Sequence, residues 1–484
     1  MLTAWNLNIQ TVHNPDEPRY AVPARIMLEK NTVESWMVPE FNTKPRLQKP
    51  ILFYWLIAAT GAIGQALGIN VVLAMRFGPL LMGLLGVIGT FLLGRKLFGA
   101  RCGFMAALVL MTAKFYHDIS RELVVDMTLT AFCVWSWVFV VDALEKIRGR
   151  YFFPGDRAEG RAPTGSAFFP LLGFYLCMGL ACMTKGPALV ALFVVAPLLV
   201  MLWRSDRLGD LKRAGLLWGV PFSIVIGFAW FIAMQISGHD ILGVLKRENL
   251  ARAVGGKDHQ QYIPCWFYVN NMFENFAPWC VLLPFAAWWT VRYLRRGPSD
   301  KSQVGVRAKK KLSDSEMLLA CGLGVSFLLL GLIVSKRALY LLPLYPFLSL
   351  WIAWYWENAF LAREGERCGK AWSAGFTIAG IAVIAGITVA FRHRDELLMS
   401  GNEMPLLLIL GVSIAGALYL ISKSLERGQR MQACLQILAV ASVLCIGYEA
   451  VFRPIRERDA DSVLFYKKVS ERLQGRQLVM MGNS

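Results

Sequence analysis

The sequence predicts an all-α polytopic membrane protein. Hydrophobic residues make up 56% of the 484 residues and the mean hydropathy is +0.46. Soluble domains are nearer one half apolar and interrupt their apolar runs with charges. Ten stretches of spanning length and two shorter ones predict about 12 transmembrane helices. The twelve stretches are 72–93, 102–116, 124–145, 168–184, 187–203, 214–235, 276–293, 316–334, 338–358, 372–391, 404–422 and 432–450.

Basic residues set the expected orientation of these helices. The net charge is +18, which in a soluble protein would suggest a nucleic-acid partner. Here the lysines and arginines gather in short loops between apolar runs, as is typical of cytoplasmic loops and of contacts with lipid headgroups. We therefore expect membrane lipids, and no nucleic acid, as partners. The loops predicted to be cytoplasmic are 95–101, 146–150, 204–213, 295–311, 363–370 and 423–430.

This orientation limits which of the first apolar runs can cross the membrane. If loop 95–101 is inside, helix 72–93 enters from outside, so the apolar run 51–69 does not cross and is interfacial or re-entrant. An outer N-terminus with no helix before it also predicts that a first transmembrane helix is missing. The expected domains are an outer-face loop with interfacial helices (1–70), the transmembrane helices with a long outer loop at 237–275 (71–452), and a truncated soluble outer tail (453–484).

The polar segment before the first apolar run holds the first candidate catalytic group. Asn14 can cap a helix whose first residue is Pro15, and Glu17 at the third helical position can close a capping box. Asp16 would then share one face of the helix with Arg19. The alternative interpretation is structural, because acidic residues favour helix N-termini through the helix dipole.

Two charged residues among the spans have a functional and a structural interpretation. Asp126 lies just inside the outer end of helix 124–145, where a carboxylate costs free energy unless it is paired or faces a wet cavity. Lys185 lies in a Thr-Lys-Gly-Pro turn between two spans at the predicted outer surface. The structural alternatives are a plain helix-end charge for Asp126 and a lysine that reaches to the interface for Lys185.

The outer loops also hold cations that run against the usual topology. Lys336 and Arg337 form a basic outer turn just before Tyr340, and such a departure suggests an anion to be held. A phosphate or pyrophosphate at the membrane surface fits the outer charges better than a neutral solute does. These charges are the cations Arg19, Lys49, Lys185, Arg247, Arg252, Lys336 and Arg337 and the carboxylates Asp16 and Asp126.

Metal ligands are weakly indicated. His259 in the long outer loop is a candidate ligand, but no second His or Cys follows at ligand spacing, and a solvated loop histidine is the alternative. The ten cysteines lie mostly inside apolar runs, as small buried hydrophobes do, although a bridge between Cys265 and Cys280 stays open. The sequence thus predicts no cofactor with certainty and leaves a divalent metal ion open.

A series of short motifs resembles the phospholipid carrier-dependent glycosyltransferases of the GT-C fold. This group includes the aminoarabinose transferase that acts on lipid A and, more distantly, the protein O-mannosyltransferases. The motifs keep the family's order and spacing over about residues 14–346, and the C-terminal third matches only as membrane helices. The motifs are Pro-Asp-Glu-Pro-Arg-Tyr-Ala (15–21), Lys-Pro-(x)3-Tyr-Trp (49–55), Gly-Arg-Lys-Leu-Phe-Gly (94–99), Arg121 with Asp126, Thr-Lys-Gly-Pro (184–187), Arg-Glu-Asn (247–249), Pro-Trp (278–279) and Ser-Lys-(x)3-Tyr-Leu-Leu-Pro (335–343).

The resemblance implies roles for individual residues. It makes Asp16 the catalytic base, with Glu17 as its neighbour and Asp126 as the second acidic position. It implies one more membrane helix than the twelve counted here, placed before the Asp-Glu loop. Where relatives commonly read Glu-Lys-Pro, this chain has Gln48 before Lys49, which weakens the expectation of a metal site. By the same resemblance, Arg19, Lys49 and Lys185 hold the carrier phosphate, and Lys336, Tyr340 and Arg247 lie beside the donor sugar or phosphate.

The function implied is inverting transfer of a sugar from a polyprenyl-phosphate carrier. The acceptor, a lipid A-like lipid, a protein or a glycan, would be modified at the outer, periplasmic face of a bacterial cytoplasmic membrane, as part of building the cell envelope. Two alternatives remain, a flippase-like or non-catalytic lipid-phosphate-binding protein and a secondary transporter. A transporter would have charges near the bilayer midplane and two related halves, whereas the charges here gather at one surface.

Overall fold

The computed structural model describes residues 16–153, 163, 165–244, 246, 266–295, 312–333, 336–363, 365, 376–381, 383–385, 388 and 403–453. The chain forms two compact units. The larger is Arg19–Glu364, and the smaller combines Met1–Pro18 with Gly365–Ser484.

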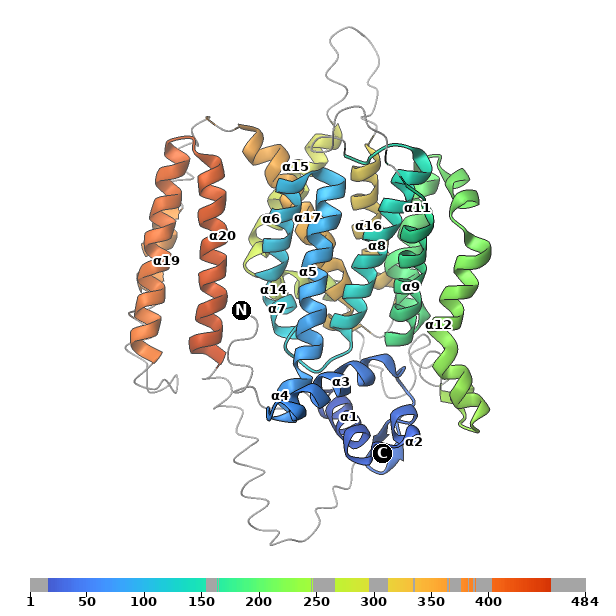
Figure 1. Cartoon of the computed structure of the whole chain (residues 1–484). Coiled ribbons are helices and arrows are strands. Elements are labelled where there is room, and N and C mark those ends of the chain that lie inside the picture. Colours follow the sequence, from blue (N-terminus) through green and yellow to red (C-terminus); the bar gives the residue numbers. More distant parts are fainter. Residues whose placement is uncertain are drawn as a thin grey trace. The chain divides into compact units, whose positions relative to one another are not determined.

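The larger unit begins with a layer of short helices at one end of a helix bundle (Figure 1). The layer consists of α1 (Pro18–Lys30), α2 (Val33–Met37), the two-residue strands β1 (Glu40–Phe41) and β2 (Lys44–Pro45), α3 (Leu52–Ala66) and α4 (Val71–Met75). The strands pair antiparallel. At 15 residues, α3 is shorter than the roughly 20 that a bilayer requires.

Helix α1 begins later than the sequence analysis predicts. Its first residue is Pro18, and Asp16 and Glu17 form a turn before it, so the predicted helix start at Pro15 is wrong. The second proline of the motif explains the difference. In a helix that started at Pro15, Pro18 would lack the N–H for the first intrahelical hydrogen bond and would disfavour the helical conformation at Glu17. Pro18 is instead suited to the first helical position.

Hydrogen bonds of two tryptophans and a tyrosine connect this layer to the bundle and connect its own segments to one another. The Trp230 Nε1 group donates to the Met37 carbonyl at 2.8 Å, and Trp55 Nε1 donates to the Trp36 carbonyl at 2.7 Å. The Tyr54 hydroxyl accepts a hydrogen bond from Arg46 Nε at 3.3 Å. Burial raises the pKa of Tyr54, and Arg46 acts in the opposite direction. Each of these groups is polar at one end only, so it can join an apolar core to a wetter edge.

The bundle that follows consists of helices of spanning and shorter length that lie side by side (Figure 1). Its elements are α5 (Phe77–Phe98), α6 (Ala100–Met111), α7 (Lys114–Ile119), α8 (Asp126–Arg148), α9 (Phe168–Lys185), α10 (Pro187–Val190), η2 (Ala191–Val195), α11 (Ala196–Arg204), η3 (Leu208–Arg213), α12 (Leu216–Ile236), α14 (Phe267–Asn275), η5 (Trp279–Leu282), α15 (Leu283–Arg295), α16 (Asp314–Leu332), η6 (Ala338–Leu344), α17 (Tyr345–Tyr355), η7 (Trp356–Phe360) and η8 (Leu361–Arg363).

The smaller unit contributes two further long helices and a short extension. These are α19 (Glu403–Glu426), α20 (Arg430–Gly447) and η9 (Tyr448–Phe452). The first two pack along each other. The predicted outer tail after 453 lies outside the described residues.

Nine helical segments in the described part of the chain are long and apolar enough to cross a membrane, which makes this an integral membrane protein. They are Val71–Phe98, Asp126–Arg148, Phe168–Lys185, Pro187–Arg204, Leu216–Ile236, Asp314–Leu332, Ala338–Phe360, Pro405–Glu426 and Arg430–Val451. Each matches one of the twelve predicted spans.

The other three predicted spans do not reach full length among the described residues. The predicted 102–116 becomes α6, which ends at Met111, where the Thr112 hydroxyl donates back to the Leu108 carbonyl at 2.6 Å. The predicted 276–293 is divided, because η5 follows Pro278 and α15 begins only at Leu283. Most of 372–391 lies outside the described residues. Cys280 forms no disulfide among the described residues, and Cys265 lies outside them, so a bridge between the two stays a prediction.

Close packing between α5 and α6 allows a stability prediction. A Cβ atom added at Gly103 would lie 2.5 Å from the Phe91 carbonyl oxygen and 2.7 Å from the Arg95 nitrogen. Both contacts are with backbone atoms of α5, which cannot move aside as a flexible side chain can. We therefore expect Gly103→Ala to destabilise the protein by about 1–3 kcal/mol. Gly324→Ala in α16 is the matched control, because a Cβ there meets open space. It should raise stability by up to about 1 kcal/mol. Thermal unfolding in detergent micelles measures both, and equal unfolding temperatures would contradict this packing.

Candidate functional site

Three residues with predicted roles meet where α8 begins, α9 ends and η6 passes. The Lys185 ammonium donates a hydrogen bond to Oδ1 of Asp126. The same ammonium lies 4.6 Å from the centroid of the Tyr340 ring. The side chains of Lys185 and Asp126 are only 7% and 4% exposed, and Tyr340 is buried as well. We refer to these three residues as the Asp126 cluster.

The ends of two helices create this arrangement. Asp126 is the first residue of α8 and Lys185 the last of α9, and the two helices pack along each other. A carboxylate is favoured at a helix N-terminus and an ammonium at a C-terminus, so both dipoles support the pair. Gly186 then turns the chain with a φ of 96°, a conformation that favours glycine, and Pro187 opens the next helix. The Thr-Lys-Gly-Pro motif thus holds Lys185 at this level of the bundle.

The chemistry of the cluster suits an anionic ligand. A lysine ammonium has three N–H donors and no acceptor. One donor serves Asp126, and the face of the Tyr340 ring attracts the same positive charge. Donor capacity therefore remains for an additional anion such as a phosphate oxygen. Because the ion pair is buried, removal of either partner would leave a costly uncompensated charge.

The layer of short helices packs against the residues that flank the cluster. Val125 precedes Asp126, and Met183 lies two residues before Lys185. Both are buried in one apolar cluster with Tyr20 of α1 and with α3. The Tyr20 ring meets the Phe53 ring edge to face at 5.1 Å. The larger unit therefore places the first part of α1 and all of α3 at the same end of the bundle as the Asp126 cluster.

The predicted phosphate-binding cations lie on segments that adjoin this end. Arg19 is in the first turn of α1, and Lys49 lies three residues before α3; both are half-buried. Lys336 is also half-buried and lies two residues before η6, which carries Tyr340. The roles of Arg19, Lys49 and Lys336 in phosphate binding remain predictions.

The predicted acidic pair lies in the turn before α1. Glu17 is 1% exposed and Asp16 is half-buried. Burial of the Glu17 carboxylate is costly unless it is paired or hydrogen-bonded. Their catalytic role remains a prediction.

The connection between α6 and α8 contains buried polar residues that the sequence analysis did not treat as site residues. Arg121 is completely buried, and His117 and Asp118 are also buried. Asp118 pairs with Lys114 across 3.7 Å, and the Ser120 hydroxyl donates to the His117 carbonyl at 2.7 Å. A signal was available in the sequence, because several ionisable residues crowd into a short connection between two apolar runs.

Other predicted residues lie beyond what the structure describes. Arg247, Arg252 and His259 belong to the long loop and lie outside the described residues, as do their predicted contacts. Within the described ranges, no group of three or more His, Cys, Asp or Glu side chains could hold a metal ion.

The chain is similar in sequence to a family profile and to several named glycosyltransferases. A family profile described as dolichyl-phosphate-mannose-protein mannosyltransferase matches residues 48–155, a range that includes Lys49 and Asp126. Two proteins from Pseudomonas fluorescens (strain Pf0-1) are named undecaprenyl phosphate-alpha-4-amino-4-deoxy-L-arabinose arabinosyl transferase 1 and 2. The first is 30% identical over 56% of this chain and 44% of its own length, and the second is 25% identical over 89% and 70%. The chain thus spans less than half of the first of these relatives.

The fold also has a solved counterpart. The crystal structure of ArnT from Cupriavidus metallidurans bound to undecaprenyl phosphate superposes with a TM-score of 0.68 at 18% identity, covering 99% of this chain and 80% of that one. The same protein in the apo state gives a TM-score of 0.66. In sequence this chain is therefore similar to the mannosyltransferase profile and to the undecaprenyl phosphate-aminoarabinose arabinosyl transferases, and in fold it is similar to ArnT.

Proposed function

We propose that the chain transfers a sugar from a polyprenyl-phosphate carrier to a lipid A-like acceptor in a bacterial cytoplasmic membrane. The observation that carries the proposal is the buried Lys185–Asp126 pair against Tyr340, in a fold shared with a protein solved with undecaprenyl phosphate. The arabinosyl transferase names of the relatives support a pentose with an amino group as the sugar.

The donor phosphate is assigned to the cations at this end of the bundle. Lys185 retains N–H donors beyond the one that serves Asp126, so it can bind a phosphate oxygen without losing its partner. Arg19 and Lys49 would contribute further charge from α1 and from the segment before α3. Lys336, Tyr340 and Arg247 would lie beside the sugar or its phosphate. Positive charge fixed before the reaction stabilises a leaving phosphate without the cost of reorganisation.

Asp16 is the proposed general base. The acceptor oxygen attacks the anomeric carbon, its proton passes to Asp16, and the bond from that carbon to the carrier phosphate breaks with inversion. The electron pair leaves on the carrier phosphate, which becomes a polyprenyl phosphate. Asp126 already accepts from Lys185, so its role is to orient that ammonium, and Glu17 supports Asp16 from the adjacent position.

The reaction is assigned to the outer, periplasmic face. The ion-paired basic loops at 146–150 and 204–213 lie at the end of the bundle opposite the Asp126 cluster, and the positive-inside rule assigns such loops to the cytoplasm. A protein or glycan acceptor would have to reach the same face, and neither requires a change in the proposed chemistry.

Release of free polyprenyl phosphate tests the proposal. The purified protein in micelles, given a radiolabelled undecaprenyl-phosphate aminoarabinose donor, should release undecaprenyl phosphate only when lipid A is added, with equimolar labelled lipid. A non-catalytic binding protein would retain the donor intact in both mixtures. Donor that binds but is never cleaved, across lipid, peptide and glycan acceptors, would overturn the proposal.

A further inference from the structure

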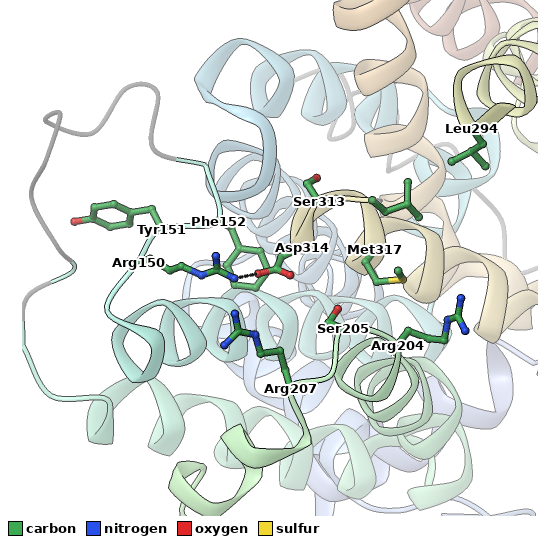
Figure 2. Close-up of a pocket in the computed structure, with 11 residues that line it drawn as sticks. Arg150, Tyr151, Phe152, Arg204, Ser205, Arg207, Leu294, Ser313, Asp314 and Met317 are labelled. Carbon is green, nitrogen blue, oxygen red and sulfur yellow. Dashed lines mark hydrogen bonds and ion pairs between the residues drawn. The ribbon is translucent and has the colours of Figure 1, made fainter. Parts of the chain in front are cut away.

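A second site lies at the opposite end of the larger unit. Helix α8 has 23 residues, which at 1.5 Å per residue separates its two ends by about 34 Å. At the end away from Asp126, a pocket of about 680 Å³ opens between the ends of α8, α11, α15 and α16 (Figure 2). It is lined by Arg150, Tyr151, Phe152, Arg204, Ser205, Arg207, Leu294, Leu312, Ser313, Asp314 and Met317.

Ion pairs connect the helix ends that surround this pocket. Arg150 pairs with Asp314 at 2.5 Å, as the dashed line in Figure 2 marks, and Arg148 pairs with the same carboxylate at 3.1 Å. Arg148 also binds Asp210 at 2.7 Å. The two aspartates are therefore fully engaged by Arg148 and Arg150. Only Arg204 and Arg207 among the arginines that line the pocket lack an ion-pair partner in the described part of the chain.

The residues that line the pocket consequently carry more positive than negative charge. Arg150 is paired with Asp314, which leaves Arg204 and Arg207 without a carboxylate among the lining residues. Asp206, between them in the chain, is exposed and does not line the pocket. Glu316, close by on α16, is committed elsewhere, because it caps Ser313 and accepts from the Tyr293 hydroxyl at 2.5 Å. Arginines without a lining carboxylate suit a phosphate group, which the planar guanidinium binds in a bidentate way.

Apolar side chains adjoin these charges. Leu294 lines the pocket and is 40% exposed, while Trp203 beside Arg204 is 61% exposed and Leu208 beside Arg207 is 46% exposed. In Figure 2, Arg204 lies on the Met317 side of the pocket and Arg207 on the Arg150 side. Arginine heads next to exposed apolar side chains at the end of a membrane helix match a lipid, which carries its phosphate where its acyl chains begin. A small soluble anion would make no favourable contact with these exposed apolar side chains.

We propose that this pocket, the Arg204–Arg207 pocket, binds the phosphodiester headgroup of an anionic membrane lipid of the inner leaflet. Arg204 and Arg207 attract the phosphate from opposite sides of the pocket, Ser205 and Ser313 offer hydroxyls to it, and the acyl chains lie along Trp203 and Leu294. Basic pockets between transmembrane helices at the cytoplasmic side are suited to such headgroups. The site is separate from the Asp126 cluster and does not depend on the proposed transfer reaction.

Lipid titration followed by native mass spectrometry tests this inference. The intact chain in micelles is titrated with phosphatidylglycerol, with phosphatidylcholine as the zwitterionic comparison. Two arginine–phosphate contacts at a membrane surface predict roughly ten- to thirty-fold weaker phosphatidylglycerol binding in Arg204→Gln/Arg207→Gln. The matched control is Lys212→Gln/Arg213→Gln, which removes the same charge from η3 outside the pocket and should change binding less than about twofold.

Two results would overturn the proposal. The first is equal loss of binding in both double variants, which would mean that net charge alone attracts the lipid. The second is displacement of phosphatidylglycerol by inorganic phosphate at millimolar concentration, which would identify a site for a free anion. Unchanged thermal unfolding of Arg204→Gln/Arg207→Gln is expected, since the structural ion pairs use Arg148 and Arg150.

Discussion

Replacement of Asp16 by asparagine is expected to reduce sugar transfer by about 10²- to 10⁴-fold, the contribution typical of a general base. Asparagine keeps the size of the side chain but cannot accept the proton of the acceptor hydroxyl. Donor affinity should change little, because the proposed phosphate contacts come from Arg19, Lys49 and Lys185. The rate of polyprenyl phosphate release at saturating donor and acceptor measures the effect.

Glu29→Gln in α1 is the matched control for Asp16→Asn. Glu29 lies in α1, the helix that follows Asp16 in the chain, and its side chain is 57% exposed in a surface pair with Arg25. Surface pairs of this kind contribute at most about 1 kcal/mol, so this variant should retain normal transfer. Near-normal turnover in Asp16→Asn would remove Asp16 from the mechanism and would leave Glu17 as the carboxylate to examine. A loss in both variants would instead indicate a general requirement for negative charge on this layer.

Replacement of Lys185 by methionine is expected to have the largest effect on stability, about 3–5 kcal/mol. Methionine fills a similar volume, but it leaves the carboxylate of Asp126, whose side chain is 4% exposed, buried without its cation. Asp126→Asn/Lys185→Met should recover most of this loss, because the buried site then contains no unpaired charge. Thermal unfolding of wild type, both single variants and the double variant gives the coupling energy between the two residues.

The same four proteins separate structure from function at Lys185. The double variant is expected to be stable. If Lys185 binds the donor phosphate, this variant should still require much more donor than wild type for half-maximal transfer. Recovery of both stability and donor affinity in the double variant would show that Lys185 acts only as a partner of Asp126. Stability of Lys185→Met equal to wild type would contradict the buried ion pair itself.

The sequence alone determined the class of fold and the positions of nine spanning helices, because a bilayer requires long apolar runs without charge. It also located the turn after Lys185, since glycine followed by proline ends one helix and begins the next. Local rules misjudged two positions. A helix start was predicted at Pro15, whereas Pro18 begins the helix, and a span was predicted across 276–293 that η5 interrupts.

Only the tertiary structure decided which of the charged residues meet. Lys185 and Asp126 are 59 residues apart in the chain, and hydropathy does not reveal which helices become neighbours. Lipid-facing and protein-facing helices are similarly apolar. Helices α8 and α12 are both apolar enough to cross a membrane, yet α8 is mostly buried inside the protein and α12 is mostly exposed. Packing of α8 against α9 therefore creates the Asp126 cluster. The sequence predicted each of its residues as a candidate separately but could not predict that they are in contact.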